Sequence, residues 1–453
     1  MVIDLVRSSS VSQATSPARR AAFEILLRVE GGAYASVLLA TREQELTPLD
    51  RALCHELVMG VLRWQLWLDT LIEHYANRKA SELDLPVRLI LRLGLYQLRF
   101  LSRVPASAAV NESVNLVNFA RLRSAGGLVN AVLRRATREP DVDPANAIID
   151  PVEKISVATS HPAWLIERWI RALGREEAEA FARANNEPAP IAFRVVKNRA
   201  QSVEVLEELR GSGANLTPSK IAGEAWKITG GGSLLAELVA AGKVYLQDEA
   251  SQLVAGVLQA QPGHRVLDLC AAPGSKTTQI ADTTSDSATI VAGDVHEHRL
   301  RTIKSTSKSH RLDRIHCVAL DGLQILPLSA NAFDRVLIDA PCSGTGTLRR
   351  NPEIRWRISS ADIQDLSQRQ RRLISNAAGT VKPGGRLVYS TCSVETEENE
   401  DVRQAFLENN RSFEPADLEL DSSLITPSGA ARTWPQRDGT DGFFICAFQR
   451  KTE

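Results

Sequence analysis

The sequence predicts a multidomain protein in which an all-α N-terminal region and a small α+β module precede a C-terminal α/β domain. Residues 17–140 carry apolar side chains at helical spacing and lack the alternation of a strand. From residue 246 onward, short apolar strands alternate with helical segments, which is typical of a mostly parallel, doubly wound sheet. Residues 187–245 combine strands with a helix and form the predicted small module.

The composition is that of a globular protein, with 43% hydrophobic and 24% charged residues. The formal net charge is zero, so no overall basic field indicates a nucleic-acid partner, and any surface for one must be local. Within residues 17–140, 17 Lys and Arg stand against 12 Asp and Glu, an excess of five positive charges. This excess fits RNA binding and equally fits an ordinary solvated surface.

Six cysteines are scattered along the chain without the spacing of metal ligands: Cys54, Cys270, Cys317, Cys342, Cys392 and Cys446. No CxxC pair occurs, which argues against a zinc site. Residues 1–17 are polar and Ser-rich, unlike a signal peptide, and no apolar run is long enough to span a membrane. We therefore expect a cytoplasmic monomer with reduced thiols, no metal and no membrane partner.

Residues 1–16 are predicted to be a flexible tail and residues 17–140 a helical bundle. The first helix carries its apolar residues on one face and ends at Gly31-Gly32; these residues are Ala22, Ile25, Leu26 and Val29. Further helices are predicted within 49–77, from Pro86 to Leu98, and over 110–121 and 128–138. Near the end of the bundle, three arginines fit either RNA contact or the preference of arginine for a helix C-terminus: Arg134, Arg135 and Arg138.

Residues 141–186 are predicted to be a linker followed by helices, with the linker at 141–160 and a helical stretch over 163–186. The small module at 187–245 then contains a strand at 191–196, a helix at 203–209 and a strand at 225–228. Its residues carry no recognisable chemistry, so no function is predicted for it.

The C-terminal domain, residues 246–453, contains six predicted strands: 265–269, 289–292, 315–320, 336–338, 386–390 and 443–448. Four consecutive strands end at an acidic residue, namely Asp268, Asp294, Asp321 and Asp339. In open α/β sheets ligands bind outside the carboxyl edge of the strands. A single acid there would be interpreted as a strand-end cap, but four in register indicate a binding site. Asp294 lies where a Rossmann-like fold places the acid that binds ribose hydroxyls.

The segment Cys270–Lys276, with the sequence CAAPGSK, follows the first of these strands. Its small residues allow the backbone to approach a ligand closely before a helix begins near Thr277. The GK[ST] signature of a phosphate-binding loop is not met, because Ser275 precedes Lys276, and no GxGxxG occurs. The segment therefore fits an adenosine ligand without a phosphate chain.

Two cysteines follow the fourth and fifth strands. Cys342 lies three residues after Asp339, and Cys392 follows the run Tyr389-Ser-Thr ahead of an acidic helix start at 395–400. If the two strands are neighbours, both thiols lie at one edge of the sheet and face one cleft. Two thiols without metal spacing in a reducing compartment suggest covalent chemistry. A redox disulfide and two unrelated buried thiols are the alternatives.

With these motifs the chain resembles the RNA cytosine-C5 methyltransferases of the Fmu/Sun type, also called the NOL1/NOP2/Sun family. Val266–Lys276 is similar to the S-adenosylmethionine motif of that family, Asp339–Cys342 to its second-cysteine motif, and Ser390–Ser393 to its nucleophile motif. The N-terminal helical region resembles the NusB-like RNA-binding domain of bacterial members that act on 16S ribosomal RNA. The resemblance thus covers nearly the whole chain after residue 17, and one departure is Ser275, where the family usually has Gly.

The resemblance implies an enzyme that transfers the methyl group of S-adenosylmethionine to C5 of a cytosine in RNA, with 16S ribosomal RNA as the expected substrate. It implies that Cys392 attacks C6 of the cytosine, that Cys342 assists release and that Asp339 contacts the base near N3. Asp294 would hold the ribose hydroxyls and Asp321 the adenine amino group. The cofactor-binding residues implied are Cys270, Ala271, Ala272, Pro273, Gly274, Ser275, Lys276, Asp294, Asp321 and Asp339.

Several basic residues near these motifs have open roles. Lys276 is expected to contact the cofactor or an RNA phosphate, or to lower the pKa of a thiol. Arg349, Arg350 and Arg355 follow the second-cysteine motif and would meet the RNA backbone, unless they belong to an ordinary solvated loop.

Three other functions remain open at this point. Within the family, transfer RNA is the alternative substrate. Outside it, the helical region would fit an RNA-binding or antitermination module joined to an inactive methyltransferase fold, against which Cys392, Cys342 and Asp339 argue by being intact. A thiol redox protein is the third alternative, and titration of the free thiols in the native protein would test it.

Overall fold

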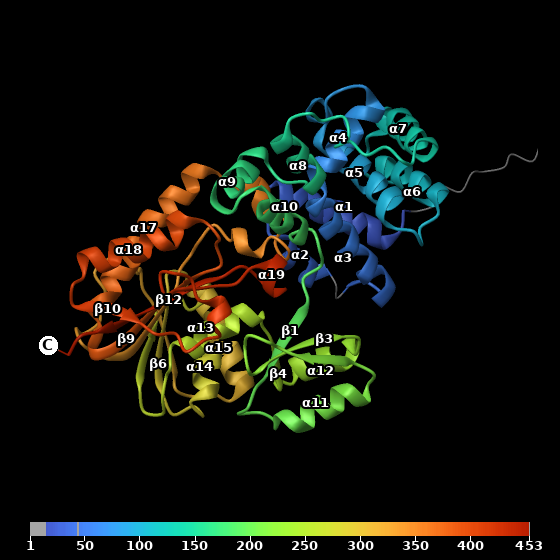
Figure 1. The fold of residues 1–453 in the computed structure, drawn as a ribbon. Coiled ribbons are helices and arrows are strands. Elements are labelled where there is room, and N and C mark those ends of the chain that lie inside the picture. Colours follow the sequence, from blue (N-terminus) through green and yellow to red (C-terminus); the bar gives the residue numbers. More distant parts are fainter. Residues whose placement is uncertain (1–14, 43–44, 453) are drawn as a thin grey trace, which may run out of the picture. The chain divides into compact units, whose positions relative to one another are not determined.

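The computed structural model describes residues 15–42 and 45–452. The chain divides into two compact units, shown with their elements in Figure 1. Unit 1 comprises the chain up to Asn186 together with Arg350–Trp356, and unit 2 comprises Glu187–Arg349 and Arg357 onward. Apart from Thr15 and Ser16, the tail predicted at residues 1–16 lies outside the described residues.

Unit 1 is helical throughout its described residues, as the sequence predicts. Its helices are α1 (Pro17–Glu30), α2 (Ala35–Arg42), α3 (Pro48–Arg63), α4 (Gln65–Ala76), α5 (Leu85–Phe100), α6 (Ala106–Phe119), α7 (Gly126–Arg138), α8 (Pro151–Thr159), α9 (Ala163–Leu173) and α10 (Arg175–Ala184), with 3-10 turns at Ala80–Glu82 and Arg123–Ala125. The apolar faces of α1, α3, α5 and α7 form one core around residues such as Leu26, Leu57, Ile90 and Leu133. This burial stabilises the bundle.

The helical stretch expected within 49–77 consists of two helices, α3 and α4, separated at Trp64. The first amide groups of a helix have no partner within that helix. Here the side-chain oxygen of Ser160 accepts from the amides of Leu66 and Trp67 at 2.9 Å and 3.4 Å. Because Ser160 lies more than ninety residues away in the sequence, local periodicity does not reveal this break.

The segment expected to be a linker at 141–160 contains the helix α8. Pro151 occupies its first turn, and the carboxylate of Asp150 accepts a hydrogen bond from the amide of Glu153 at 2.8 Å. An acidic N-cap followed by proline is a sequence signal for a helix start. Because residues 141–151 are rich in Asp and Pro, the segment was predicted to be a linker and this helix start was missed.

The expectation that the loop after Cys342 offers arginines to RNA is wrong for Arg349 and Arg355, which are both buried. Within unit 1, the Arg355 guanidinium donates to the carbonyl oxygens of Ser160 at 3.1 Å and Asn185 at 3.3 Å. These two residues end α8 and α10, so the cation satisfies carbonyl groups that have no partner in their own helix. The role of Arg355 is structural.

Unit 2 begins with the small α+β module that the sequence predicts. Its antiparallel sheet has the order β2-β3-β1-β4 and carries two helices. The elements are β1 (Ile191–Val195), α11 (Ser202–Gly211), β2 (Asn215–Pro218), β3 (Ala225–Thr229), α12 (Gly232–Ala240) and β4 (Val244–Leu246). The two strands and the helix expected here are present. β2 and β4 have only four and three residues, too few for a periodic pattern, and α12 was not predicted.

The larger sheet of unit 2 has eight strands within the described residues, in the order β10-β12-β9-β8-β5-β6-β7, with β11 paired to β12. The central strands are β5 (Arg265–Asp268), β6 (Thr289–Asp294), β7 (Ile315–Ala319), β8 (Phe333–Asp339) and β9 (Val381–Thr391), which are parallel. The edge strands β10 (Phe413–Ala416), β11 (Ala431–Arg432) and β12 (Phe444–Arg450) pair antiparallel. Between β5 and β8 the strand order reverses, which is where open α/β sheets bind ligands.

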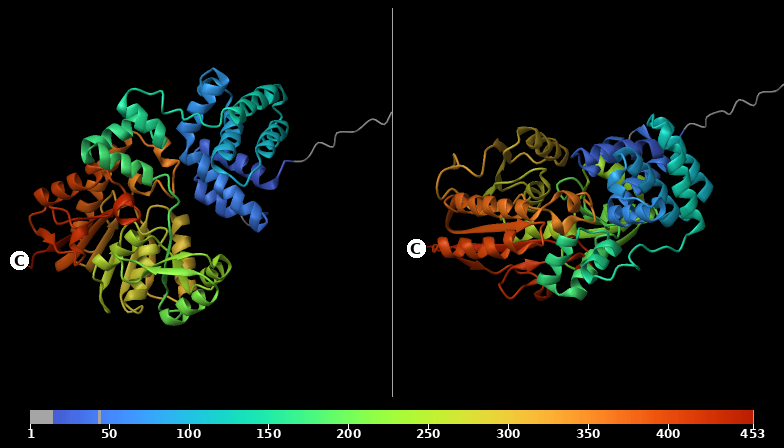
Figure 2. Two further views of the ribbon diagram at one scale, coloured as in Figure 1. Left: turned by 45° about the vertical axis from the view of Figure 1, so that its right-hand side comes forward. Right: turned by 90° about the horizontal axis from the view of Figure 1, so that it is seen from above.

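Helices cover both faces of this sheet, as Figures 1 and 2 show. The remaining helices of unit 2 are α13 (Glu249–Val257), α14 (Ser275–Thr283), α15 (Glu297–His310), α17 (Ser360–Ala378), α18 (Glu400–Asn409) and α19 (Pro435–Asp438), with 3-10 turns at Thr345–Thr347, Thr396–Glu398 and Ser422–Leu424. The short helix α16 (Ile354–Arg357) belongs to unit 1 except for its last residue. One core joins α17 and α18 to residues such as Val336 and Leu387, and the other joins α13 and α14 to Leu337 and Val388. Neighbouring strand residues therefore face opposite cores, as a doubly wound sheet requires.

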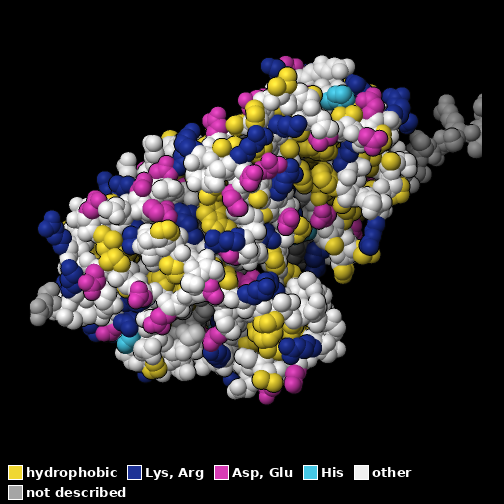
Figure 3. Space-filling view, in the orientation of Figure 1, with side chains coloured by type: hydrophobic (Ala, Val, Ile, Leu, Met, Phe, Trp, Pro, Cys, Tyr) yellow, Lys and Arg dark blue, Asp and Glu magenta, His cyan; other side chains and the backbone are white. Residues whose placement is uncertain are grey.

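The surface carries no single dominant sign of charge on the face drawn in Figure 3. Lys and Arg side chains are interspersed there with Asp and Glu among the described residues. Of the arginines near the end of the bundle, Arg135 donates to the carbonyl oxygens of His74 and Tyr75 in the last turn of α4.

No helix in the described parts of the chain is long and apolar enough to cross a membrane.

His310, the last residue of α15, makes the stability of unit 2 sensitive to acid. Its ring is buried against Tyr245, and burial together with Arg194 and Arg199 lowers the pKa of His310 to about 4. An unfolded histidine titrates near ~6.5, so between these values the unfolded state binds the proton and the folded state does not. Stability is therefore lost as the pH falls through this window, with a slope of at most about 1.4 kcal/mol per pH unit.

We expect His310→Leu to reduce that slope in urea unfolding curves measured between pH 7 and pH 5. The exposed His298 on the same helix provides the matched control, and His298→Leu should retain the slope of the parent protein. An unchanged slope in His310→Leu would show that His310 does not carry the effect.

Candidate active site

A cavity of ≈ 430 Å³ lies where the strand order reverses, at the carboxyl edge of the large sheet. The loops after β5, β6, β7, β8 and β9 all contribute to its lining, and α17 closes one side. The residues from these loops that line it are Leu269, Cys270, Ala272, Asp294, Val295, His296, Leu320, Asp321, Gly322, Leu323, Asp339, Ala340, Pro341, Cys342 and Cys392. The predicted edge therefore forms a concave site of the size that holds a small-molecule ligand.

Three of the four strand-end acids line this cavity: Asp294, Asp321 and Asp339. The fourth, Asp268, does not; it is buried and accepts a hydrogen bond from the Thr277 hydroxyl at 2.7 Å. Burial raises the pKa of Asp268 to about 7. For this residue the strand-end cap is the correct interpretation, because it links β5 to the first turn of α14.

Asp294 and Asp321 each have one carboxylate oxygen held by a nearby amide. The amide of His296 donates to Asp294 at 2.9 Å, and the amide of Leu323 donates to Asp321 at 2.9 Å. Arg299 lies 3.4 Å from the other oxygen of Asp294 and also donates to the carbonyl of Ala272. Both carboxylates are thus oriented by the backbone on a wall of the cavity.

The predicted cofactor segment, Cys270–Lys276, divides into residues that line the cavity and residues that support them. Cys270 and Ala272 line it, whereas Ala271, Pro273, Gly274, Ser275 and Lys276 do not. Gly274 has φ +105° and precedes the first turn of α14, a backbone conformation that favours glycine. The thiol of Cys270 is buried, which raises its pKa and keeps it protonated.

Cys342 and Cys392 meet at the same end of the cavity, as the adjacency of the fourth and fifth strands predicts. β8 and β9 are parallel neighbours, and the two sulfur atoms lie 3.3 Å apart. The hydrogen bond between the thiols and the burial of the site raise the pKa of Cys342 well above its ordinary value. Cys342 therefore holds its proton and can donate it to the sulfur of Cys392.

Asp339 is held between two side chains next to these thiols. Lys276 donates to one carboxylate oxygen at 2.7 Å, and the hydroxyl of Ser390 donates to the other at 2.8 Å. Lys276 is buried, and its ion pair with Asp339 outweighs the desolvation, so the pKa of Lys276 is raised. The lysine thus remains charged beside the thiol pair and contributes to the electrostatics of the site.

Glu398 is a site-supporting residue that the sequence did not single out. One carboxylate oxygen accepts from the amide of Ser343 at 2.9 Å and from the side chain of Gln370 at 2.9 Å. The other accepts from the hydroxyls of Ser343 and Ser393. These serines directly follow Cys342 and Cys392, so one buried carboxylate ties both cysteine loops together.

The large sheet and its cavity lie in a part of the chain that matches a known protein family. A family model described as 16S rRNA methyltransferase RsmB/F matches residues 255–449. The chain is 35% identical over 443 residues to "Probable ribosomal RNA small subunit methyltransferase B" of Bacillus subtilis (strain 168), covering 96% of this chain and 98% of that protein. The chain belongs to the RsmB/F family of 16S rRNA methyltransferases.

Other members of the RsmB/F family match the chain over the same length. "Ribosomal RNA small subunit methyltransferase B" of Pseudomonas putida is 35% identical over 439 residues, covering 95% of this chain and 97% of that protein. Family models also match the N-terminal region, at residues 16–138 for the NusB family and 161–234 for the ferredoxin-like domain of RsmF/B-like methyltransferases. The predicted NusB-like region and α+β module are therefore confirmed.

Solved structures confirm the fold. The crystal structure of PH0851 has a TM-score of 0.82 and 28% identity to this chain, covering 96% of this chain and 98% of that one. A methyltransferase homologue from Pyrococcus horikoshii has a TM-score of 0.59 and 28% identity, covering 67% of this chain and 100% of its own. With its RsmB/F relatives, the chain is an RNA methyltransferase.

Proposed function

We propose that this chain transfers the methyl group of S-adenosylmethionine to C5 of a cytosine in 16S ribosomal RNA, through a covalent bond between Cys392 and C6 of the base. The observation that carries the proposal is the 3.3 Å approach of the Cys342 and Cys392 sulfurs at the cavity that Asp294 and Asp321 also line. The relatives named as small subunit ribosomal RNA methyltransferases support 16S ribosomal RNA as the substrate.

The cavity suits S-adenosylmethionine in both size and chemistry. Its volume of ≈ 430 Å³ lies in the range of small-molecule sites. Asp294 follows the second strand of the parallel sheet, the position from which an acid accepts hydrogen bonds from ribose hydroxyls. Asp321, whose second oxygen takes no amide, can accept from the adenine amino group. When bound, S-adenosylmethionine supplies the electrophilic methyl group that C5 attacks.

Covalent chemistry is required because C5 of cytosine is a poor nucleophile. Addition of the Cys392 thiolate to C6 breaks the C5–C6 double bond and makes C5 enamine-like. Lys276 is buried and charged, and its ion pair with Asp339 holds it beside the two thiols. Addition places negative charge on N3, which takes up a proton, and Asp339, held in place by Lys276 and Ser390, is positioned to accept a hydrogen bond from the resulting N3–H and so stabilise the adduct.

The thiol pair also suggests an order of events. Before attack, Cys342 holds a proton because the neighbouring sulfur and burial raise its pKa. Once the Cys392 sulfur bonds carbon, that neighbour no longer carries negative charge, and Cys342 can release its proton to solvent. The Cys342 thiolate then takes the C5 proton, and the C5–H electron pair restores the C5–C6 double bond and expels Cys392 as a thiolate. Cys342 acts on release rather than on attack.

Bisulfite sequencing of 16S ribosomal RNA from cells with and without the gene tests this function. We expect one or more cytosines to be protected from conversion only when the gene is present, and the purified protein to restore the protection with S-adenosylmethionine. Sequencing transfer RNA in parallel tests whether transfer RNA is the substrate instead. Protection confined to transfer RNA would reassign the substrate, and protection in neither RNA would contradict the reaction.

Asp294→Ala is expected to weaken S-adenosylmethionine binding. The variant removes a charge-assisted hydrogen bond to a vicinal diol, a loss of about 1.5–3 kcal/mol or roughly ten- to more than hundredfold in affinity. Isothermal titration calorimetry measures the change directly. Asp313→Ala, which removes an exposed acid before β7 that does not line the cavity, is the matched control and should bind like the parent protein. Equal affinity in a folded Asp294→Ala protein would remove Asp294 from the cofactor site.

A further inference from the structure

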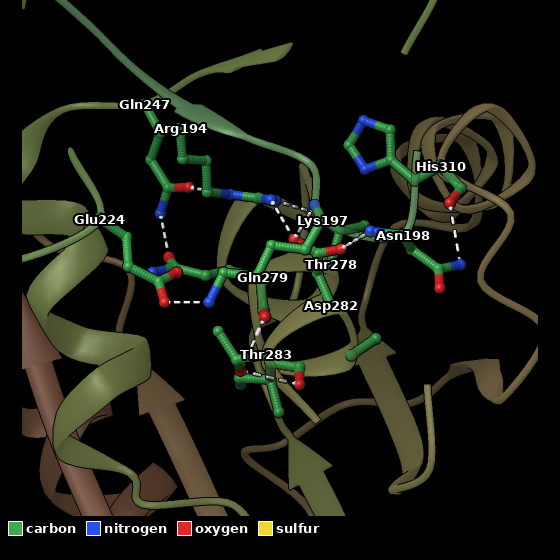
Figure 4. Close-up of polar contacts among 12 residues, drawn as sticks. Arg194, Lys197, Asn198, Glu224, Gln247, Thr278, Gln279, Asp282, Thr283 and His310 are labelled. Carbon is green, nitrogen blue, oxygen red and sulfur yellow. Dashed lines mark hydrogen bonds and ion pairs between the residues drawn. The ribbon is translucent and has the colours of Figure 1, made fainter. Parts of the chain in front are cut away.

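The small module of unit 2 packs against α14 through a buried polar network centred on Arg194, drawn in Figure 4. Arg194 lies in β1 and is 1% exposed. Its guanidinium donates to Gln247 at 3.1 Å and to the hydroxyl of Thr278 at 3.1 Å, and it lies 3.5 Å from the carboxylate of Asp282. A buried guanidinium is costly unless its donors are satisfied. This network therefore fixes the orientation of Arg194.

The network has two arms on α14. One arm ends at Asp282, whose carboxylate also accepts the backbone amides of Lys197 and Asn198 at 3.0 Å and 2.8 Å. Asp282 lies in the last turn of the helix, at the end away from the cavity loop. This arm joins the module to α14 without approaching the lining of the cavity.

The second arm leads to the predicted cofactor segment. The hydroxyl of Thr278, which accepts from Arg194, donates in turn to the carbonyl oxygen of Gly274 at 2.8 Å. Gly274 precedes α14 and ends the loop in which Cys270 and Ala272 line the cavity. Thr278 is completely buried, so water does not compete for either bond. In a buried chain of this kind, the charge on the guanidinium strengthens the bond that the hydroxyl donates.

We propose that Arg194 is a positioning residue for S-adenosylmethionine: through Thr278 it holds the Gly274 carbonyl, and with it the loop Cys270–Gly274. The inference rests on the proposed function, because it takes this loop as the cofactor site. It gives the module at 187–245 a role for which its own sequence offers no signal. The module supports the cofactor loop from behind, and its integrity is needed for cofactor affinity.

The decisive test is Thr278→Val, which replaces the hydroxyl with a methyl group of similar size and interrupts the chain at its middle bond. We expect a three- to tenfold weaker affinity for S-adenosylmethionine by calorimetry, about the effect of one hydrogen bond in a buried network. The KM for S-adenosylmethionine should rise by a similar factor while the KM for RNA is unchanged. Thr278→Ser keeps the hydroxyl and should bind like the parent protein.

Two further variants separate positioning from simple stabilisation. Arg194→Met should weaken binding as Thr278→Val does, and the double variant should be no weaker than the weaker single variant, because both remove the same chain. Asn198→Ala removes the side-chain hydrogen bond from the module to the carbonyl oxygen of Arg311 at 2.6 Å and leaves Arg194 with all its partners, so it should lower the melting temperature and leave the affinity unchanged. If Arg194→Met fails to fold, the comparison of Thr278→Val with Thr278→Ser still decides the question.

The outcomes of this set distinguish the inference from the proposed function. If the parent protein binds S-adenosylmethionine and Thr278→Val binds equally well, Arg194 and Thr278 are structural only and the inference is overturned. If Asn198→Ala weakens binding as strongly as Thr278→Val, general loosening of the module explains the effect and the inference again fails. If the parent protein binds no S-adenosylmethionine at all, the proposed function itself is wrong.

Discussion

Cys392→Ala is expected to abolish methyl transfer and to form no covalent RNA adduct, whereas Cys342→Ala is expected to trap one. The two sulfurs are 3.3 Å apart, so position alone does not assign their roles. The roles follow from the resemblance of Ser390–Ser393 to the nucleophile motif of the family and of Asp339–Cys342 to its second-cysteine motif. The pKa of Cys342 is raised by its hydrogen bond to Cys392 and by burial, which fits a residue that still holds its proton during attack. Loss of Cys342 should therefore leave attack intact and stop the expulsion of Cys392.

The measurement is denaturing gel electrophoresis of the protein incubated with RNA and S-adenosylmethionine. Cys342→Ala should give a band of protein joined to RNA that survives denaturation and disappears in the double variant with Cys392→Ala. Cys317→Ala is the control, because that thiol does not line the cavity, and it should turn over normally. An adduct in Cys392→Ala that vanishes in Cys342→Ala would exchange the two assignments. No adduct in either variant would favour a redox role for the pair.

Local sequence signals were sufficient for the parts of the site that follow strands. Three of the five parallel strands end at an acid, Asp268, Asp294 and Asp339, so the carboxyl edge, its acids and the pairing of Cys342 with Cys392 followed from strand order. The same reasoning wrongly placed Asp268 in the binding site, because the sequence of a strand-end acid is the same whether its side chain faces a cavity or caps a helix. Only the direction of the side chain separates the two cases, and a sequence does not carry that direction.

Residues that act through distant partners were missed for a related reason. Arg194 contacts Thr278 and Asp282, which lie 84 and 88 residues away along the chain. Arg355 looked like a surface arginine in a polar loop, but it is buried where two helices end. Charged residues are seldom fully buried, so exposure is the default expectation for each. Arg194 and Arg355 are buried nevertheless, because the fold brings them hydrogen-bond partners from distant parts of the chain.

Glu398 is the clearest case, since an acidic run before a helix is ordinarily a solvated start. Here the carboxylate is fully buried in the turn Thr396–Glu398 and accepts hydrogen bonds from Ser343, Ser393 and Gln370. Burial raises its pKa, and these donors oppose the shift. Removing the carboxylate would take this acceptor from the backbone amide of Ser343, the side-chain amide of Gln370 and the two serine hydroxyls, at a cost of about 1–3 kcal/mol in stability.

Glu398→Ala is expected to lower kcat by about a hundredfold, the effect of displacing reacting groups by roughly 1 Å. The reason is that the loops of Cys342 and Cys392 lose the acceptor that sets the separation of the two sulfurs. Affinity for S-adenosylmethionine should not change, because Glu398 does not line the cavity. Steady-state kinetics and calorimetry on the same protein check both statements.

Glu398→Gln provides the matched variant, since it keeps the shape of the side chain and one acceptor oxygen. Its oxygen can still accept from the Ser343 amide, and its NH₂ can donate to the serine hydroxyls if they rotate, so most of the link between the loops survives. We expect kcat to recover to within about tenfold of the parent protein, as for the loss of roughly one hydrogen bond. Introduced into Cys342→Ala, Glu398→Ala should slow formation of the RNA adduct whereas Glu398→Gln should not. If the double variant Cys342→Ala, Glu398→Ala forms the adduct as fast as Cys342→Ala alone, the carboxylate does not set the thiol geometry. The two loops are then held by their strands alone.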